Sequence, residues 1–312
     1  GRNPAVSEVV AAYLKRKKPK WADSTHRIRD ISLSVFEAWL IGRERRGHVG
    51  IDMLTRKVLD DYWFYLREDR GQSEGTASDR IGHLVRLWNW AYHNEDFGFF
   101  VSRPPSVEEL DFPRGVYPRA VAPTWEQMDA AISECSREHW RRLLILLRCT
   151  GLRPGQALRL DWDDFDLDRG ELLIRPELGK SRQERRGRII PIAPVLVSEM
   201  AGWGTREGSV IGKPKGWNPN RKTPRQIWER SGWAPRQPLH CFRKGFKTEL
   251  RRAGASRDAV DFLQGHAGAS MDDVYLDPRA LPLNETVAMI PPIGSRVRSV
   301  SSFKKKAKPR QL

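Results

Sequence analysis

A proline-rich stretch interrupts the helical pattern of this chain between residues 96 and 123. Its prolines are Pro104, Pro105, Pro113, Pro118 and Pro123. Proline lacks a backbone donor and clashes with the preceding turn, so a continuous helix cannot cross this stretch. A chain of 312 residues is long enough for two hydrophobic cores. The sequence therefore predicts a domain at residues 1–95, a linker at residues 96–123 and a second domain at residues 124–290.

The segment before the linker carries four groups of apolar residues at the spacing of one helix face. These groups begin at Val6, Ile28, Leu54 and Ile81. Apolar side chains three or four positions apart form a stripe that a helix must bury against another element. Gly42 follows the second group and is predicted to lie just beyond the end of that helix. We expect a bundle of four short amphipathic helices with basic exposed faces.

The second domain is predicted to be mainly helical with a small antiparallel sheet. Thr124 and Gln127 have the spacing of a capping box that opens a helix. Two short strands are expected at residues 171–174 and 188–192, joined by a flexible basic turn. Helical spacing returns at residues 239–253 and 257–263. Residues 202–237 are rich in glycine, proline and tryptophan, and their pattern supports no assignment.

Charge indicates a polyanionic partner. The chain has 55 Lys and Arg against 39 Asp and Glu, a formal net charge of +16. Such a surface attracts double-stranded DNA, although ribosomes, RNA and anionic lipid fit charge alone equally well. No acidic residue follows Glu285, and residues 291–312 form a basic tail that we expect to be disordered when free. The tail could lie along DNA, pack on a neighbouring subunit or simply be solvated.

Several classes of protein are disfavoured. The three cysteines are far apart and form no CxxC pair, which argues against a disulfide framework and a structural zinc site. No apolar run is long enough to span a membrane, and the start lacks a signal-peptide pattern, so a cytoplasmic, nucleoid-associated protein is expected. The acids from Asp161 to Asp168 do not fit a calcium loop and are interpreted as a solvated turn. No nucleotide-binding or zinc-protease motif occurs, and we expect no metal and no cofactor.

Four separated segments of the second domain carry reactive side chains in a fixed order. They are Thr150-Gly151-Leu152-Arg153, then Lys180 in the basic turn, then His240-Cys241-Phe242-Arg243, and finally Leu263-Gln264-Gly265-His266 with Tyr275 nine residues later. In order and local spacing this set resembles the tyrosine recombinase (phage integrase) family. TGLR or HxxR alone occurs often by chance, whereas the whole set across about 125 residues of a basic chain is specific.

The resemblance implies a catalytic role for each of these residues. Tyr275 would be the nucleophile that forms a phosphotyrosine. Arg153 and Arg243 would stabilise the charge on the nonbridging phosphate oxygens. Lys180 would protonate the departing 5′ oxygen, and His240 and His266 would contact the phosphate or manage the tyrosine proton. These residue types suit the chemistry, because a phenol can store the energy of a phosphodiester bond without water or metal.

Less specific interpretations of the same residues stay open. Arg153 could be an ordinary surface arginine, Tyr275 a core aromatic, and a neighbouring arginine of the basic turn could replace Lys180. His240, Arg243 and Lys247 fall on one helix stripe, which we expect to face out of the core, beside an apolar stripe of Phe242, Phe246 and Leu250. The chain departs from the family at Gln156, where an acidic residue usually supports the first arginine, and at Phe242 and Lys244 in the third segment.

The resemblance implies a site-specific DNA recombinase that works through a 3′-phosphotyrosine, as integrases of mobile genetic elements do. We expect two domains that clamp duplex DNA, a dimer on one site and a tetramer when two sites are joined. One alternative is a type IB topoisomerase-like enzyme, which relaxes DNA with the same residues. Another is a catalytically inactive DNA-binding accessory protein. The sequence does not specify the target site, the direction of the reaction or any accessory protein.

Overall fold

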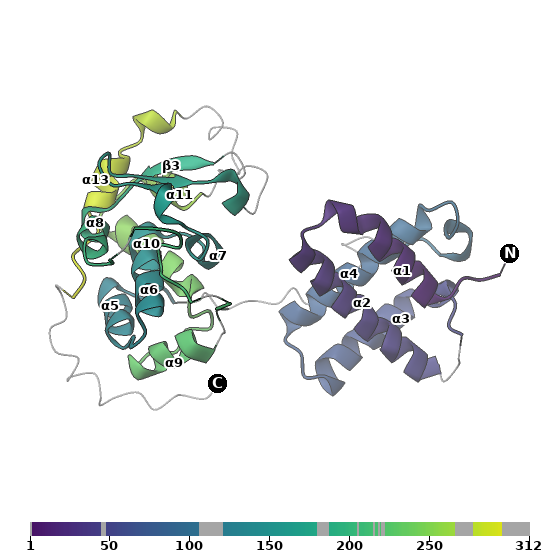
Figure 1. Cartoon of the computed structure of the whole chain (residues 1–312). Helices are drawn as coiled ribbons and strands as arrows, with labels where there is room; N and C mark the ends of the chain where they lie inside the picture. Colours follow the sequence, from purple (N-terminus) through teal and green to yellow (C-terminus); the bar gives the residue numbers. More distant parts are fainter. Residues whose placement is uncertain are drawn as a thin grey trace. The chain divides into compact units, whose positions relative to one another are not determined.

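The computed structural model divides the chain into two compact units, residues 1–119 (unit 1) and residues 120–312 (unit 2) (Figure 1). The structure describes residues 2–44, 48–105, 121–179, 187–204, 206–214, 216–217, 219, 222–265 and 277–294. Each unit has its own cluster of buried apolar side chains. No helix among the described residues is long and apolar enough to cross a membrane.

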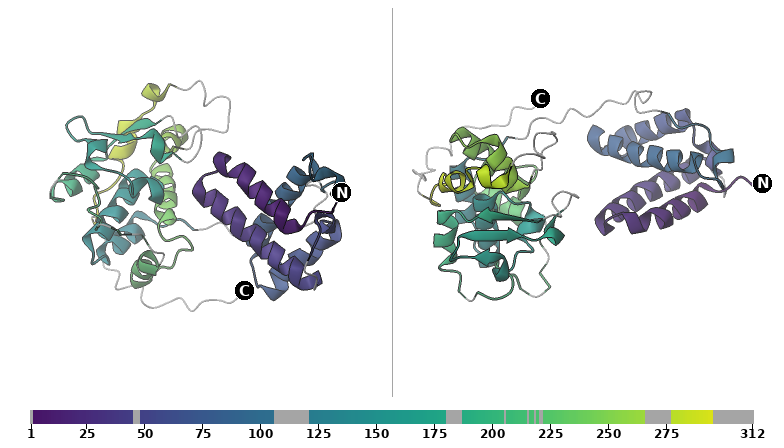
Figure 2. Two further views of the ribbon diagram at one scale, coloured as in Figure 1. Left: turned by 45° about the vertical axis from the view of Figure 1, so that its right-hand side comes forward. Right: turned by 90° about the horizontal axis from the view of Figure 1, so that it is seen from above.

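Unit 1 contains the four predicted helices, packed around one core (Figures 1 and 2). They are α1 (Val6–Lys17), α2 (Asp23–Glu44), α3 (Arg56–Phe64) and α4 (Glu74–Tyr92). A single π-helical turn, Tyr65–Asp69, extends α3. The prediction that α2 ends before Gly42 is wrong, because the helix continues to Glu44. One glycine costs a helix only about 1 kcal/mol, which the packing of a long helix offsets.

Side-chain hydrogen bonds cap two helices of unit 1 and hold the chain that follows α4. Thr55 accepts from the backbone of Val58 at the start of α3, and Ser73 accepts from Thr76 at the start of α4. Each satisfies one of the amide donors that a helix leaves free at its first turn. After α4, the Trp88 indole donates to the Ser102 carbonyl at 2.7 Å, and Val101 is buried in the core. The chain is therefore held on unit 1 as far as residue 102.

Unit 2 is mainly helical, as predicted, and contains α5 to α13 (Figure 1). Its helices are α5 (Trp125–Ser133), α6 (Glu138–Thr150), α7 (Pro154–Ala157), α8 (Pro194–Met200), α9 (Lys222–Arg230), α10 (His240–Arg252), α11 (Arg257–Gln264) and α13 (Leu283–Ala288). The capping box of Thr124 and Gln127 opens α5 as expected. From Leu143 to its end α6 is buried, and α10 packs against both α5 and α6. The apolar stripe of α10 thus faces the centre of the unit.

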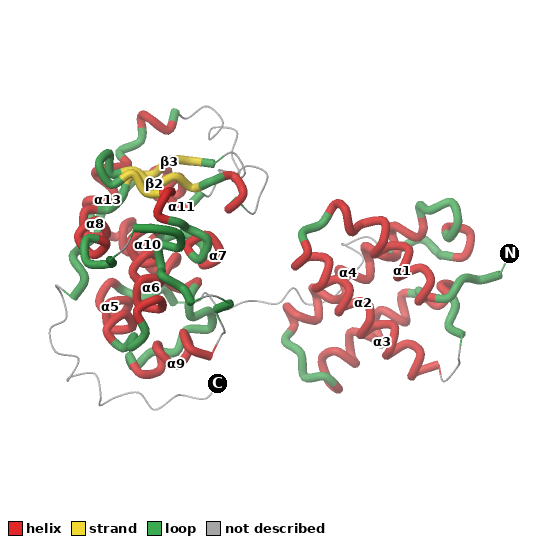
Figure 3. Tube along the Cα trace, in the orientation of Figure 1, coloured by secondary structure: helices red, strands yellow, loops and turns green. Residues whose placement is uncertain are grey.

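A three-stranded antiparallel sheet lies apart from α5 and α9 within unit 2 (Figure 3). Its order is β1 (Phe165–Asp166), β2 (Glu171–Ile174) and β3 (Arg188–Pro191), with Leu172 opposite Ile190. The two predicted strands are confirmed, and β3 ends one residue early. The solvated turn predicted at Asp161–Asp168 is wrong in part, because this segment contains β1. Its Asp164 is only 4% exposed and forms an ion pair with Arg175 at 2.8 Å.

A buried ion pair fastens the chain that follows α13. Arg148 of α6 is fully buried and donates to both carboxylate oxygens of Asp129 on α5. The same guanidinium donates to the carbonyl of Pro291 at 3.0 Å, and Asp129 accepts from the backbone of Gly294 at 3.0 Å. A buried charge is tolerated only when it is paired and hydrogen-bonded. Residues 291–294 are therefore bound to α5 and α6, although this stretch was assigned to the basic tail.

Candidate active site

Three of the predicted catalytic residues, Arg153, His240 and Arg243, lie in described parts of unit 2. The other three, Lys180, His266 and Tyr275, lie outside the described residues. The structure does show the residues that precede two of them, Gly179 before Lys180 and Gly265 before His266. The structure therefore shows which contacts hold the segments that carry or precede the predicted catalytic residues.

The turn that leads to Arg153 depends on Gly151. This residue ends α6 in the left-handed conformation, with φ of +61°. A β-carbon at this position would lie 2.4 Å from the ring of Phe246, which is fully buried on α10. Only glycine combines this backbone conformation with such close packing. The turn therefore lies directly on α10, and Arg153 follows it at the start of α7.

Gln156 supports the backbone of Arg153. Its side chain is buried, and its Oε1 accepts from the Arg153 N–H at 3.1 Å. Its Nε2 donates to the carbonyl of Leu178 at 3.4 Å, and Arg159 donates to the same carbonyl at 3.2 Å. Leu178 lies two residues before Lys180 in the sequence. Gln156 thus supports the backbone of Arg153, and Gln156 and Arg159 together hold the Leu178 carbonyl, two residues before Lys180.

Arg243 connects three segments of the site. Its Nη1 donates to the carbonyl of Gly151 at 2.9 Å, two residues before Arg153. Its own carbonyl accepts from Gln264 at 2.7 Å, at the end of α11. The expectation that the stripe of His240, Arg243 and Lys247 faces out of the core is wrong for Arg243, which is only 4% exposed. The guanidinium donates into the turn between α6 and α7, and α11 packs on α10 beside the Arg243 backbone.

His240 stands at the beginning of α10 and is half-buried. The carbonyl of Pro238, two residues before His240, accepts a hydrogen bond from the Trp228 indole at 2.6 Å and another from the Cys241 thiol at 3.2 Å. The Trp228 ring also contacts Phe242, with 5.2 Å between centroids. Packing from α9 therefore fixes the entry into α10. Burial raises the pKa of the Cys241 thiol, so this neighbour of His240 stays protonated and is a poor nucleophile.

The end of α11 is attached to the sheet by Arg188, the first residue of β3. Its Nη2 donates to the carbonyl of Leu263 at 3.2 Å. Gly265 ends α11 in the left-handed conformation, and a β-carbon there would lie 2.5 Å from the Arg188 Nη1. A cation at a helix C-terminus satisfies a free carbonyl and offsets the helix dipole. Arg188 thus joins the base of the β2–β3 hairpin to the residue that precedes His266.

Sequence reasoning did not assign a role to Arg188 or Gln264. Gln264 is fully buried and links α11 to the backbone of Arg243. A glutamine inside the Leu263–His266 segment was visible in the sequence, but its partner lies 21 residues away. The partner of Arg188 lies 75 residues away. No local pattern predicts contacts at such separations.

The described part of the site is rich in cationic groups and contains no cluster that could bind a metal ion. It contains Arg153 and Arg243, two side chains of the kind that bind anionic groups, and Arg243 donates to the Gly151 carbonyl two residues before Arg153. Within the described residues, no group of three His, Cys, Asp or Glu side chains is placed to bind a metal ion. Arg243 therefore connects the turn before Arg153, the first turns of α10 and the end of α11 through hydrogen bonds.

Comparison with known proteins gives a family match over this unit. The phage integrase family model matches residues 124–280, which is half of the chain. Tyrosine recombinase XerC of Haemophilus ducreyi is 29% identical over 159 residues, which are 47% of this chain and 50% of that protein. Tyrosine recombinase XerD of Mycobacterium tuberculosis is 30% identical over 144 residues, 43% of this chain and 46% of that protein. The chain thus spans about half the length of these curated relatives.

Solved structures share the fold of the chain. A lambda integrase tetramer bound to a Holliday junction aligns with a TM-score of 0.64 and 15% identity, over 89% of this chain and 79% of that one. The integrase of transposon Tn1549, solved with a circular intermediate DNA, aligns with a TM-score of 0.64 and 17% identity, over 87% and 97% of the two chains. At this level of identity, the likeness concerns the fold.

Proposed function

Because the chain belongs to the phage integrase family, we propose that it is a site-specific DNA recombinase that cuts and rejoins DNA through a covalent link to Tyr275. The observation that carries this proposal is the family match over residues 124–280, which includes all six residues of the motif set. The assembly around Arg243 supports it, because it joins the segments of Arg153, Arg243 and His266 through hydrogen bonds.

In the proposed reaction, the phenolic oxygen of Tyr275 attacks a backbone phosphorus. A 3′-phosphotyrosine bond forms and the bond to the 5′ oxygen breaks, with Lys180 as the donor of the proton that this oxygen takes up. Arg153 and Arg243 stabilise the charge on the nonbridging oxygens, and His240 and His266 contact the phosphate or the tyrosine proton. Attack by a 5′ hydroxyl on the phosphotyrosine restores the backbone, so no metal or cofactor is required.

We also propose the partners that such a reaction requires. Double-stranded DNA is the substrate, and the charge of +16 favours backbone contacts from both units. Unit 1 would be a core-type DNA-binding domain. The chain would form a dimer on one site and a tetramer when two sites are joined, as the lambda integrase neighbour does on a Holliday junction. A cytoplasmic, nucleoid-associated protein follows from such a substrate.

A nicked suicide duplex that carries the recombination site tests the proposal. The departing strand of this duplex diffuses away, so an active enzyme remains bound to DNA as a covalent adduct that survives denaturation. We expect the adduct with the unaltered protein and with Tyr92→Phe, which changes an exposed tyrosine of unit 1. We expect none with Tyr275→Phe, although this variant should still bind the duplex.

Three outcomes would redirect the assignment. A covalent adduct that persists in Tyr275→Phe would reject the assigned nucleophile. Relaxation of supercoiled plasmid that lacks the site, at the rate seen with plasmid that carries it, would favour the topoisomerase-like alternative. Binding without any adduct in the unaltered protein would indicate an inactive accessory protein.

A further inference from the structure

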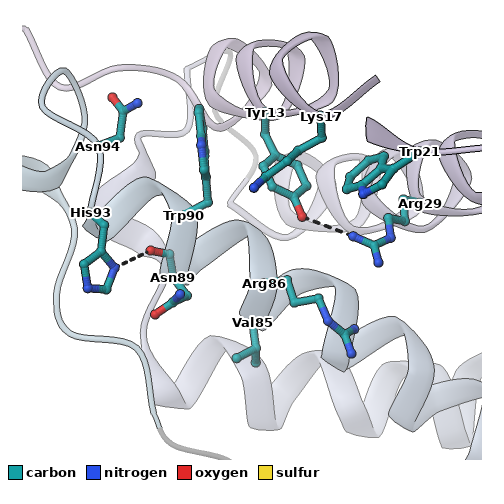
Figure 4. A pocket seen from close by; sticks show the side chains of 10 residues that line it. All are labelled: Tyr13, Lys17, Trp21, Arg29, Val85, Arg86, Asn89, Trp90, His93 and Asn94. Carbon is teal, nitrogen blue, oxygen red and sulfur yellow. Dashed lines mark hydrogen bonds between the residues drawn. The ribbon is translucent and has the colours of Figure 1, made fainter. Parts of the chain in front are cut away.

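Unit 1 contains a cavity that the strand-cleavage chemistry does not use. It has a volume of about 470 Å³ and lies between α1, the chain that leads into α2, and α4 (Figure 4). Its principal lining residues are Tyr13, Lys17, Trp21, Arg29, Arg86 and Trp90. Sites for small organic ligands have volumes of roughly 300–1,000 Å³. We call this cavity the unit 1 pocket.

Three cationic residues line the unit 1 pocket, one from each of three helices (Figure 4). Lys17 is the last residue of α1, Arg29 lies on α2 and Arg86 on α4. No carboxylate lines the pocket, and none of these cations forms an ion pair with a described residue. The pKa of nearby His83 is lowered, first by burial and then by Arg29 and Arg86. The pocket is therefore electropositive and suits an anion.

Aromatic rings line the pocket beside these cations. The buried Tyr13 ring lies between Trp21 and Trp90, with centroid distances of 5.5 and 5.3 Å, and both tryptophans are partly exposed (Figure 4). The guanidinium of Arg29 stacks on Trp21 at 4.1 Å and also approaches the Tyr13 hydroxyl, to which its Nη1 donates at 3.5 Å. These contacts fix the cation beside the aromatic wall. A ligand would therefore meet a site that is already arranged.

We propose that the unit 1 pocket binds a nucleotide, with its phosphate at the three cations and its base against the tryptophans. A bare phosphate would use the cations but leave the partly exposed indole rings without a role. An apolar ring would leave the cations unpaired. A nucleotide satisfies both halves, and a base stacked on an aromatic side chain gains about 1–3 kcal/mol in nucleic-acid complexes.

The nucleotide can have two sources, an unpaired residue of a DNA strand or a free mononucleotide. The first source rests on the proposed function, because a strand that has been cut must leave its complement before it can be joined to another. The second source does not depend on recombination. The chemistry is the same in both cases, so the two sources are separated by experiment.

The experiment measures binding of a fluorescent oligothymidylate to the full chain by anisotropy, with dTMP and inorganic phosphate as competitors. Arg29→Gln removes a pocket cation, and Trp21→Leu removes part of the aromatic wall. Arg27→Gln is the matched control, since it removes an exposed cation two residues away on the same helix. We expect roughly tenfold weaker binding for each pocket variant, as for the loss of one charged hydrogen bond or one stacked base, and less than about twofold for the control. Circular dichroism melting verifies that each variant is folded.

Equal loss in Arg27→Gln and Arg29→Gln would overturn the proposal, because binding would then depend on general charge. Unchanged binding in Trp21→Leu, together with inorganic phosphate competing as well as dTMP, would also overturn it. If dTMP competes at concentrations similar to those at which the oligonucleotide binds, the ligand is a free nucleotide. If far higher concentrations of dTMP are needed, the ligand is a DNA strand. The suicide duplex separates this proposal from the proposed function. Pocket variants at saturating protein should still form the covalent adduct, whereas Tyr275→Phe should bind the oligonucleotide without forming it.

Discussion

Replacing Gly151 by alanine tests whether the turn before Arg153 is held by its packing on α10. The new methyl group faces two costs. The left-handed backbone, with φ of +61°, disfavours a β-carbon by about 1–2 kcal/mol. The methyl would also lie 2.4 Å from the buried Phe246 ring, and overpacking of this kind costs about 1–3 kcal/mol more. We therefore expect unit 2 to lose about 2–5 kcal/mol of unfolding free energy.

Gly170→Ala is the matched control. Gly170 has a similar φ of +68°, but no atom lies within 4 Å of a β-carbon built there. This variant should pay only the backbone cost of about 1–2 kcal/mol. Urea unfolding followed by circular dichroism gives both values, and the difference between the two variants isolates the overlap with Phe246. Adding Phe246→Leu to each variant should narrow that difference, because a smaller side chain makes room for the methyl group.

The same substitution should slow DNA cleavage. A shift of the turn moves the Gly151 carbonyl, which accepts the hydrogen bond of Arg243, and moves Arg153 with it. We expect the rate of adduct formation on the suicide duplex to fall at least tenfold, since removing one well-placed donor to a transition state costs about that or more. Equal unfolding free energies for Gly151→Ala and Gly170→Ala, with normal cleavage by both, would refute the reasoning.

Two further predictions concern other parts of the chain. Arg188→Ala should slow adduct formation by roughly tenfold while leaving duplex affinity within about threefold, since the Arg188 guanidinium holds Leu263 and lies against Gly265. Arg188→Lys should recover part of the rate of adduct formation. Equal losses of rate and affinity in Arg188→Ala would contradict a positioning role. His83 has a pKa below its ordinary value of 6.5, mainly because it is partly buried. The unfolded chain therefore binds its proton more readily, so the stability of unit 1 should fall as the pH drops below about 6.5. The melting temperature of His83→Gln should depend less on pH than that of the unaltered protein. Identical pH profiles for the two proteins would contradict the role of His83 in this pH dependence.

Elements whose signal lies in neighbouring residues were predictable from the sequence. The four helices of unit 1, the capping box at Thr124 and strands β2 and β3 all depend on spacing within a few residues. Strand β1 was missed because two residues carry no periodic pattern, and its existence depends on pairing with Leu172 and Glu171. Asp164 was assigned to solvent because its partner, Arg175, comes from the end of the next strand. Each error is a case in which a tertiary partner determines the structure.

The candidate site shows the same division. Arg153, His240 and Arg243 became candidates because their segments resemble the motif set of the phage integrase family in residue type, order and spacing. The burial of Arg243 did not follow, because a helical stripe describes only its own helix and not the turn that packs on it. The Gly151 carbonyl that accepts the hydrogen bond of Arg243 lies 92 residues away in the sequence. Lys180, His266 and Tyr275 remain predictions, since they lie outside the described residues.

The glutamine at position 156 illustrates why a departure from a family pattern has to be judged by its hydrogen bonds. An ionised acid at this position could accept from the Arg153 N–H, but it could not donate to the Leu178 carbonyl, because a carboxylate has no proton to give. The amide does both, at 3.1 and 3.4 Å, in a buried environment where an unpaired charge would be costly. Gln156 thus binds both the backbone at Arg153 and the 3-10 turn Pro176–Leu178 that precedes Lys180. The neutral side chain replaces an electrostatic support of the arginine by a structural link between two segments of the proposed active site.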